Sequence, residues 1–124
     1  MIKKITSEEA WNFYSSVPVK YKKQLYFPKH GEFYAFYKED VIKSIICILN
    51  FSKKSRITCL LTDFNNRKVG YATKLLKHIL YYNKSVFTVY ATKYSKNIFL
   101  KNKFKVLSEK NDIAFMECDN NERI

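Results

Sequence analysis

The residues from Thr62 to Thr73 have the types and spacing of an anion-binding junction. They lead from a β-branched apolar run into an amphipathic helical pattern. The first turn of a helix presents unpaired backbone N–H groups and the positive end of the helix dipole. Gly70 lets the backbone approach a ligand closely, while Lys68, Lys74 and the Thr73 hydroxyl add donors for an anion. The spacing is neither G-x-x-x-x-G-K-[ST] nor G-x-G-x-x-G, so a phosphate site of another type is predicted.

Glycine usage supports this interpretation of the junction. Average usage of about 7% predicts roughly nine glycines in a chain of this length. The sequence has two, Gly31 and Gly70. A chain so poor in glycine is expected to keep one only where the backbone requires it.

The elements that position the junction follow from hydrophobic periodicity. Ala72, Leu75, Leu76, Ile79 and Leu80 recur at helical spacing and predict a helix over 70–82. Thr6 and Glu9 form a capping box that opens a second helix, and Ser95 is the expected N-cap of a third. The full expectation is strands at 2–5, 33–37, 41–51, 56–62, 86–91, 104–107 and 113–116, with helices at 7–16, 70–82 and 95–102.

This order predicts one domain over residues 1–124 of the α/β (α+β) class. Its sheet is mixed and mostly antiparallel, and helices flank it. Residues 18–31 hold both prolines and are expected to form a mobile connector with room for a helical turn. Residues 119–124 are polar and are expected to fray.

Two segments resemble the GCN5-related N-acetyltransferase (GNAT) family. Arg67-x-x-Gly70-x-Ala72, after a strand and before a Leu-Leu helix, matches the family pattern R/Q-x-x-G-x-G/A. Residues 92–104 fit N-x-x-A-x-x-F-Y-E-K-x-G-F without gaps, with Ser95 at the small position and Phe104 at the last. The resemblance extends over residues 31–118 in element order and implies an acyl-CoA N-acyltransferase fold.

The resemblance implies a V-shaped opening between the strands at 56–62 and 86–91. Acetyl-CoA would bind there as co-substrate, and an amine would attack its thioester directly from the opposite side. A backbone N–H near Leu61 or Thr62 would hold the oxyanion. The implied cofactor-binding residues are Leu60, Leu61, Thr62, Arg67, Lys68, Val69, Gly70, Tyr71, Ala72, Thr73, Thr92 and Phe99.

Three positions depart from the family pattern. Phe99 occupies the place of the tyrosine that often protonates the departing thiolate; Tyr90, Tyr94 or a water is a possible substitute. Lys103 replaces a glycine, and Asn102 is expected to take the left-handed conformation instead. Thr92 replaces an asparagine and keeps one hydroxyl for the pantetheine amides.

No catalytic residue is assigned from the sequence. Asp63, Glu32 and His30 are candidates for the base by expected location alone. No metal site is expected, because His30 and His78 lie far apart and neither has a clustered partner.

The charge balance is strongly basic, with 23 Lys plus Arg, 11 Asp plus Glu and a formal net charge of +12. It excludes an acidic solvating protein and raises the chance of a polyanionic partner. Lysine accounts for 20 of the basic residues, and Asn, Ile, Tyr and Phe are also abundant, so codon bias of an AT-rich genome (a phage or a low-GC bacterium) explains the charge equally well. Lysines assigned no role are Lys20, Lys22, Lys23, Lys53 and Lys54.

The remaining composition argues for a cytoplasmic protein. Cys47, Cys59 and Cys118 have no C-x-x-C spacing, and two of them lie in apolar runs, so reduced core thiols are expected. No apolar run reaches membrane-span length, and no signal peptide is visible.

The sequence thus predicts an acetyl-CoA-dependent N-acetyltransferase acting on a primary amine of a protein or a nucleic-acid-associated target. Two alternatives stay open. One is a catalytically silent domain of this fold that binds a protein or nucleic acid through its lysines, and the other is a related transferase that modifies a nucleic acid.

Overall fold

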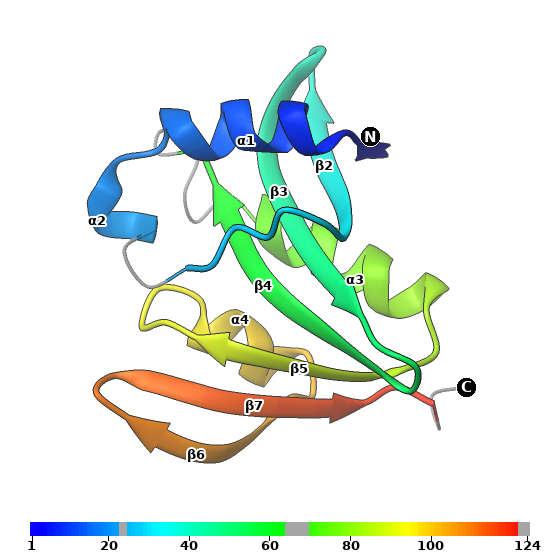
Figure 1. Ribbon diagram of the computed structural model, residues 1–124, viewed down its shortest axis with the longest axis vertical. Coiled ribbons are helices and arrows are strands. Elements are labelled where there is room, and N and C mark those ends of the chain that lie inside the picture. Colours follow the sequence, from blue (N-terminus) through cyan, green and yellow to red (C-terminus); the bar gives the residue numbers. More distant parts are fainter. Residues whose placement is uncertain (23–24, 64–69, 122–124) are drawn as a thin grey trace.

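The computed structural model describes residues 1–22, 25–63 and 70–121, and these residues form one sheet with flanking helices (Figure 1). The sheet has seven strands in the order β1-β2-β3-β4-β5-β7-β6. Along the chain the elements are β1 (Ile2–Ile5), α1 (Ser7–Ser16), α2 (Val19–Lys22), β2 (Glu32–Lys38), β3 (Val41–Asn50), β4 (Lys54–Thr62), α3 (Tyr71–Tyr82), β5 (Val86–Ala91), α4 (Lys96–Lys101), β6 (Lys105–Lys110) and β7 (Ile113–Asp119).

The predicted fold class is confirmed. Strand β4 pairs with β5 in parallel, whereas the other neighbouring strands pair antiparallel. The short helix α2 occupies the connector where a helical turn was expected. At the other end of the chain, the fraying predicted from residue 119 does not extend to Asn120. Its side-chain amide donates to the carbonyls of Leu80 and Asn83, and its N–H donates to Ser85 O at 2.9 Å.

The predicted capping box at α1 is confirmed. Glu9 N donates to Thr6 Oγ1 at 3.1 Å, and Thr6 N donates to Glu9 Oε1 at 3.0 Å. The expectation for Ser95 was wrong in one respect, since its side chain makes no capping hydrogen bond at α4. Instead, the Thr92 carbonyl accepts from the N–H groups of Ser95 and Lys96.

The left-handed residue after α4 is Lys103 (φ 71°), not Asn102 as predicted. The hydrogen bonds explain this. Phe104 N donates to Phe99 O at 3.1 Å and Lys103 N to Leu100 O at 3.3 Å, the pair of bonds that defines a Schellman motif. That motif requires the left-handed conformation one residue beyond the C-cap, so Lys103 adopts it at a cost of about 1–2 kcal/mol.

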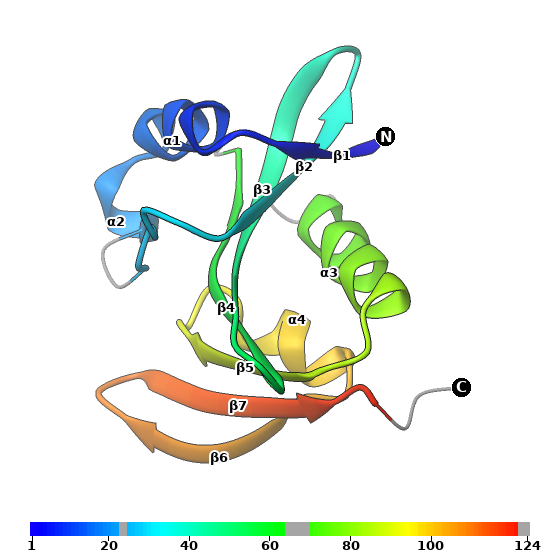
Figure 2. The ribbon, with the colours of Figure 1, turned by 45° about the vertical axis from the view of Figure 1, so that its right-hand side comes forward.

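Helices cover the two faces of the sheet unequally (Figure 2), and an apolar layer lies on each face. One lies between the sheet and α3 and α4, and draws on β3, β4, β5 and β7. The second lies under α1, on the opposite face, and its buried members from the sheet belong to β1, β2, β3 and β4. Among the described residues, no helix lies over β5, β7 and β6 on that second face. No helix in the described ranges is long and apolar enough to span a bilayer.

Candidate functional site

Strands β4 and β5 separate along their length. Residues Lys54–Ile57 pair in parallel with Val86–Val89, but the ladder between the two strands ends there. Beyond it, the rest of β4 pairs with β3, while Tyr90 and Ala91 pair with β7. Figure 1 shows the two strands diverging toward their carboxyl ends. The V-shaped opening predicted from the family resemblance is therefore present.

A β-bulge at Thr58 accounts for the divergence. Cys47 lies opposite Cys59 and Ile48 opposite Ile57, which leaves Thr58 as an extra residue in β4. A bulge bends its strand and increases the local twist. It also reverses the alternation of side chains, so Ile57 and Leu60 both face α3 although three positions separate them. The bulge thus turns β4 away from β5 immediately after the last shared pair.

The open half of β4 presents backbone groups toward the opening. Asp63 N donates to Lys43 O at 2.7 Å, which makes this a hydrogen-bonded antiparallel pair. Because such pairs alternate, the backbone groups of Leu61 face Ile45 on β3. Those of Leu60 and Thr62 point to the other side. The sequence predicted that the N–H of Leu61 or Thr62 would hold an oxyanion. Of these two groups, only the N–H of Thr62 faces the opening.

A cavity of about 590 Å³ lies at the wide end of the opening. Five of the predicted residues line it, namely Thr62, Gly70, Tyr71, Ala72 and Thr73. The loop after β5 and helix α4 supply the other side, with Lys93, Tyr94, Asn97, Ile98 and Lys101. The predicted cofactor-binding residues did not include these five; Tyr94 was named only as a possible proton donor. Asn97 and Lys101 lie four residues apart on α4, the spacing of one helix face.

Gly70 begins helix α3 in the conformation that the sequence suggested. Its φ is 95°, a left-handed value that favours glycine, and a Cβ at this position would meet nothing within 4 Å. Gly70 is thus required by the turn, and the space beside it is open. Arg67, Lys68 and Val69, also predicted to bind the cofactor, lie outside the described residues.

The cavity is electropositive in its fixed charges. The amino end of α3 contributes the positive end of its dipole, and Lys93 and Lys101 contribute ammonium groups. Lys74, a predicted donor, is not among the described residues that line the cavity, and its Nζ lies 5.7 Å from the ring centroid of Phe36. Phe36 in turn stacks on Tyr71 at 4.8 Å. The walls therefore suit a polyanion.

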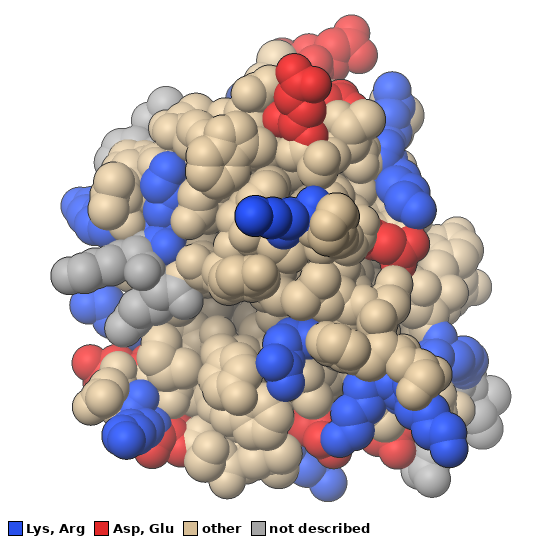
Figure 3. Space-filling view, viewed as in Figure 1, with Lys and Arg blue, Asp and Glu red and all other residues tan. Residues whose placement is uncertain are grey.

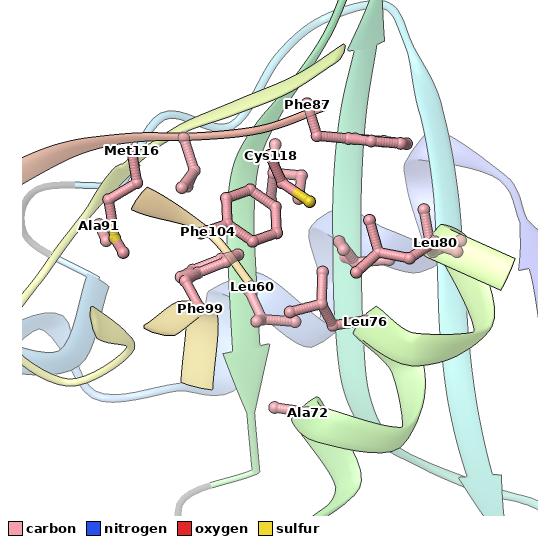
Figure 4. Packing of buried hydrophobic residues seen from close by; sticks show 14 of the residues in the cluster. Leu60, Ala72, Leu76, Leu80, Phe87, Ala91, Phe99, Phe104, Met116 and Cys118 are labelled. Atoms are coloured by element: carbon pink, nitrogen blue, oxygen red, sulfur yellow. The ribbon is translucent and has the colours of Figure 1, made fainter. Parts of the chain in front are cut away.

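Phe99 and Thr92 lie close to the cavity but do not line it. Phe99 is 1% exposed and makes an edge contact with Phe104 at 5.0 Å. Figure 4 shows both rings in the core beside Leu60. Thr92 is buried, and its Oγ1 accepts from Tyr94 N at 3.3 Å. Phe99 therefore belongs to the packing layer rather than to a reacting surface.

The two tyrosines considered as substitutes differ in whether they line the cavity. Tyr94 lines the cavity, and its ring meets that of Tyr21 on α2 at 5.3 Å. Tyr90 is 51% exposed on the face opposite to Val89 and Ala91, where its ring lies 4.8 Å from Phe115. Only Tyr94 therefore has its side chain in the cavity.

The structure separates the candidate bases from the cavity. Asp63 lines a different hollow, beneath α1, and its carboxylate lies 4.0 Å from Lys43 Nζ. Glu32 lies on β2, two strands from β4, and accepts from Lys4 and Asn50. His30 precedes Glu32 in the same part of the chain and is exposed. None of the three lines the cavity between β4 and α4.

Basic side chains do not gather into one track on the face seen in Figure 3. They form several groups with uncharged surface between them, and the acidic side chains lie mainly toward the upper and lower edges. Within the described parts of the chain, no three His, Cys, Asp or Glu side chains cluster as a metal site would require. The local positive charge of the cavity comes from the amino end of α3, from Lys93 in the loop after β5 and from Lys101 on α4.

Comparison with known proteins identifies the fold. No family model and no curated protein sequence matches the chain. Solved structures do match. A putative N-acetyltransferase from Lactobacillus plantarum superposes with a TM-score of 0.74 at 12% identity, over 94% of this chain and 96% of that one. A GNAT-family acetyltransferase from Staphylococcus aureus gives 0.71 at 14% identity, over 97% and 98%.

A third match is a structure solved with coenzyme A. N-acetylglutamate synthase from Neisseria gonorrhoeae, complexed with coenzyme A and N-acetyl-glutamate, superposes with a TM-score of 0.75 at 15% identity. The match covers 94% of this chain and 34% of the synthase. The chain thus has the GNAT fold, with a mostly antiparallel seven-stranded sheet and flanking helices.

Proposed function

We propose that this chain is an acetyl-CoA-dependent N-acetyltransferase that moves the acetyl group to a primary amine by direct attack on the thioester. The observation that carries the proposal is the open half of β4 beside an electropositive cavity of about 590 Å³. The fold shared with acetyltransferases, one of them solved with coenzyme A, supports it.

The cofactor would extend from the wide end of the opening toward its narrow end. Its pyrophosphate would accept hydrogen bonds from the N–H groups at the start of α3, where Gly70 leaves room. The pantetheine amides would pair with the backbone of Leu60 and Thr62 as an added strand does. When the amine attacks the carbonyl carbon, the oxyanion would form nearer to the narrow end, beside the N–H of Leu60, which also faces the opening.

Collapse of the tetrahedral intermediate breaks the carbon–sulfur bond and releases the thiolate of coenzyme A. Tyr94 is the proposed donor of the proton to that sulfur, since its side chain lines the cavity and Phe99 has no proton to give. A thiol pKa near 8.5 makes thiolate a fair leaving group, so the donor accelerates the step without being indispensable.

Calorimetric titration with acetyl-CoA tests the binding half of the proposal. Gly70→Asn and Gly70→Asp form a matched pair, because both residues tolerate a left-handed φ and are nearly equal in size. The aspartate places a negative charge beside the expected pyrophosphate and should weaken binding at least about 10-fold relative to the asparagine. Equal affinities, or no binding to the unmodified protein, would contradict the proposal.

A second candidate, an acyl-CoA-binding domain without transfer, is favoured by Phe99 at the family's tyrosine position. The two functions differ in turnover. Release of free coenzyme A in the presence of an amine supports the transferase, whereas tight binding without release from any amine supports the silent domain.

A further inference from the structure

The sheet face opposite the cavity carries an uncovered aromatic and cationic site. In Figure 1, α1 and α2 lie in front of the upper strands, while β5, β7 and β6 have no helix in front of them. Arg56, Tyr90 and Phe115 lie on this face. We call these three residues the Arg56 site.

The guanidinium of Arg56 is held over an aromatic surface. Its central carbon lies 5.3 Å from the ring centroid of Tyr90, and its Nε donates to Thr88 Oγ1 at 3.5 Å. The Tyr90 ring lies 4.8 Å from that of Phe115. A guanidinium stacked on a ring keeps its outer N–H groups free to bind.

Arg56 has no acidic partner among the residues that the structure describes. The ion pairs there are Lys4–Glu32, Lys43–Asp63 and Lys96–Glu109. Its nearest acidic neighbour in register is Glu117, across Thr88, and no carboxylate oxygen in residues 1–22, 25–63 or 70–121 forms an ion pair with Arg56 within 4.0 Å. A half-buried guanidinium without a carboxylate is an anion site of the bidentate kind.

The Arg56 site lies at the narrow end of the opening between β4 and β5. Arg56 precedes Ile57, the last residue of β4 that pairs with β5, and Tyr90 follows Val89, the last residue of β5 that pairs with β4. Both therefore flank the narrow end of the opening, on the face away from α3 and α4. An acyl arm that entered from the wide end would present its thioester to this face.

We propose that Arg56 binds an anionic group, a carboxylate or a phosphate, carried by the amine acceptor. This rests on the proposed acetyl transfer. The acceptor's ammonium first loses a proton to solvent, and its amine then forms the new carbon–nitrogen bond of the tetrahedral intermediate, whose collapse breaks the carbon–sulfur bond. The second proton leaves the nitrogen, and the thiolate is protonated. Arg56 positions the acceptor and takes no part in these proton transfers.

The hollow beneath α1 suits acceptors of the opposite charge. It is lined by Glu9, Asp40 and Asp63 among other residues, and acidic walls would select cationic acceptors. Anionic and cationic acceptors therefore point to different faces of the protein, and a panel of amines can separate them.

The first experiment measures acetylation of amino acids against their amides, and of O-phosphoethanolamine against ethanolamine. The amine that carries a free carboxylate or phosphate should be acetylated faster than its neutral analogue. The larger of the two rate enhancements identifies the anion that Arg56 prefers. Arg56→Gln should lower kcat/KM for the anionic amine by about 10- to 100-fold, chiefly through KM, the usual effect of losing a hydrogen bond to a charged group. Arg56→Lys should recover part of it.

Lys53→Gln is the matched control, because it removes one positive charge from the exposed β3–β4 turn. It should leave the selectivity for anionic amines intact. The proposal is overturned if Arg56→Gln and Lys53→Gln give equal rates with the anionic acceptor, or if amides and cationic amines are the better acceptors.

Nuclear magnetic resonance of the Arg56 Nε–H group tests binding without turnover. In the presence of coenzyme A, glycine or O-phosphoethanolamine should shift this resonance, and ethanolamine should not. No shift with either anion overturns the proposal. Failure of acetyl-CoA binding in calorimetry would instead contradict the proposed function, and the two failures are therefore distinguishable.

Discussion

The two halves of β4 differ in how many neighbouring strands they pair with. Residues Ser55–Ile57 are paired on both sides, with β3 and β5, whereas residues Cys59–Thr62 are paired with β3 alone. The first half is tied further by side chains, because Ser55 Oγ bonds to Asn50 Oδ1 at 2.8 Å and to Ser85 Oγ at 3.0 Å. The second half leaves backbone groups of Leu60 and Thr62 unpaired with another strand.

This difference separates stability from binding within a single strand. Where β4 is paired, its side chains and backbone are satisfied by the protein itself, and substitutions there should act on folding. Where β4 is open, the protein leaves groups for a ligand, and substitutions beside it should act on binding or turnover. A one-residue bulge at Thr58 marks the boundary.

The largest expected effect lies in the paired half. Ile57 is 2% exposed within the core beneath α3. Ile57→Ala should lower the free energy of unfolding by about 2–5 kcal/mol, through lost burial and a cavity. Urea denaturation measures this, with Ile57→Val as the milder control at about 0.5–1.5 kcal/mol. Weakened acetyl-CoA binding by the folded variant would contradict the proposal that the paired half of β4 acts on stability and the open half on binding.

The next effect lies in the cavity beside the open half of β4. Tyr94→Phe should lower kcat by about 10²-fold if its hydroxyl protonates the departing thiolate. Because the Tyr94 side chain is 41% exposed, the urea midpoint and the affinity for acetyl-CoA should hardly change. Tyr81→Phe, on the exposed side of α3, is the control. An undiminished kcat in Tyr94→Phe would assign the proton to water.

Phe99→Tyr asks whether the family's tyrosine position still belongs to the reacting surface. Phe99 is 1% exposed, so an added hydroxyl would be buried without a partner and should cost about 1–3 kcal/mol of stability. The turnover of the folded variant should not rise. A gain in kcat would show that this position reaches the thioester after all.

The smallest effect concerns acid. Burial raises the pKa of Glu32, but hydrogen bonds from Asn50 and Lys4 outweigh it and hold the pKa below its ordinary value of 4.5. A carboxyl group whose pKa is lower in the folded than in the unfolded state stabilises the protein when the pH lies above its unfolded-state pKa. This contribution disappears as the pH falls through the folded-state pKa. Urea midpoints should therefore drop below pH 4.5, and Glu32→Gln should flatten that drop. Acetyl-CoA affinity should not follow it.

Local pattern was enough to predict the elements. The apolar spacing of Ala72 to Leu80 predicted a helix over 70–82, and the structure has Tyr71–Tyr82. The strand at 86–91 was predicted with its observed ends. Gly70 was identified from its rarity, and its left-handed φ bears out that inference. These features depend on neighbours in sequence, which periodicity and residue type report directly.

The features that were not predicted depend on partners far along the chain. Apolar and β-branched residues flank Thr58 on both sides, so nothing local distinguishes the bulge, which exists only relative to the register of β3. The role of Lys103 follows from the hydrogen bonds of a Schellman motif, not from its type. Glu32 and Asp63 were candidates for the base because sequence alone does not tell which strands lie between a carboxylate and the opening.

The two thiols beside the bulge make the opening of β4 measurable by chemical labelling. Cys47 and Cys59 face each other across β3 and β4, and a hydrogen bond between them together with burial raises the pKa of the Cys47 thiol. Because both thiols are buried and alkylation needs an accessible thiolate, they should resist iodoacetamide until the two strands part. The rate of labelling in native buffer then reports how often β4 detaches, and a ligand seated along its free edge should slow it.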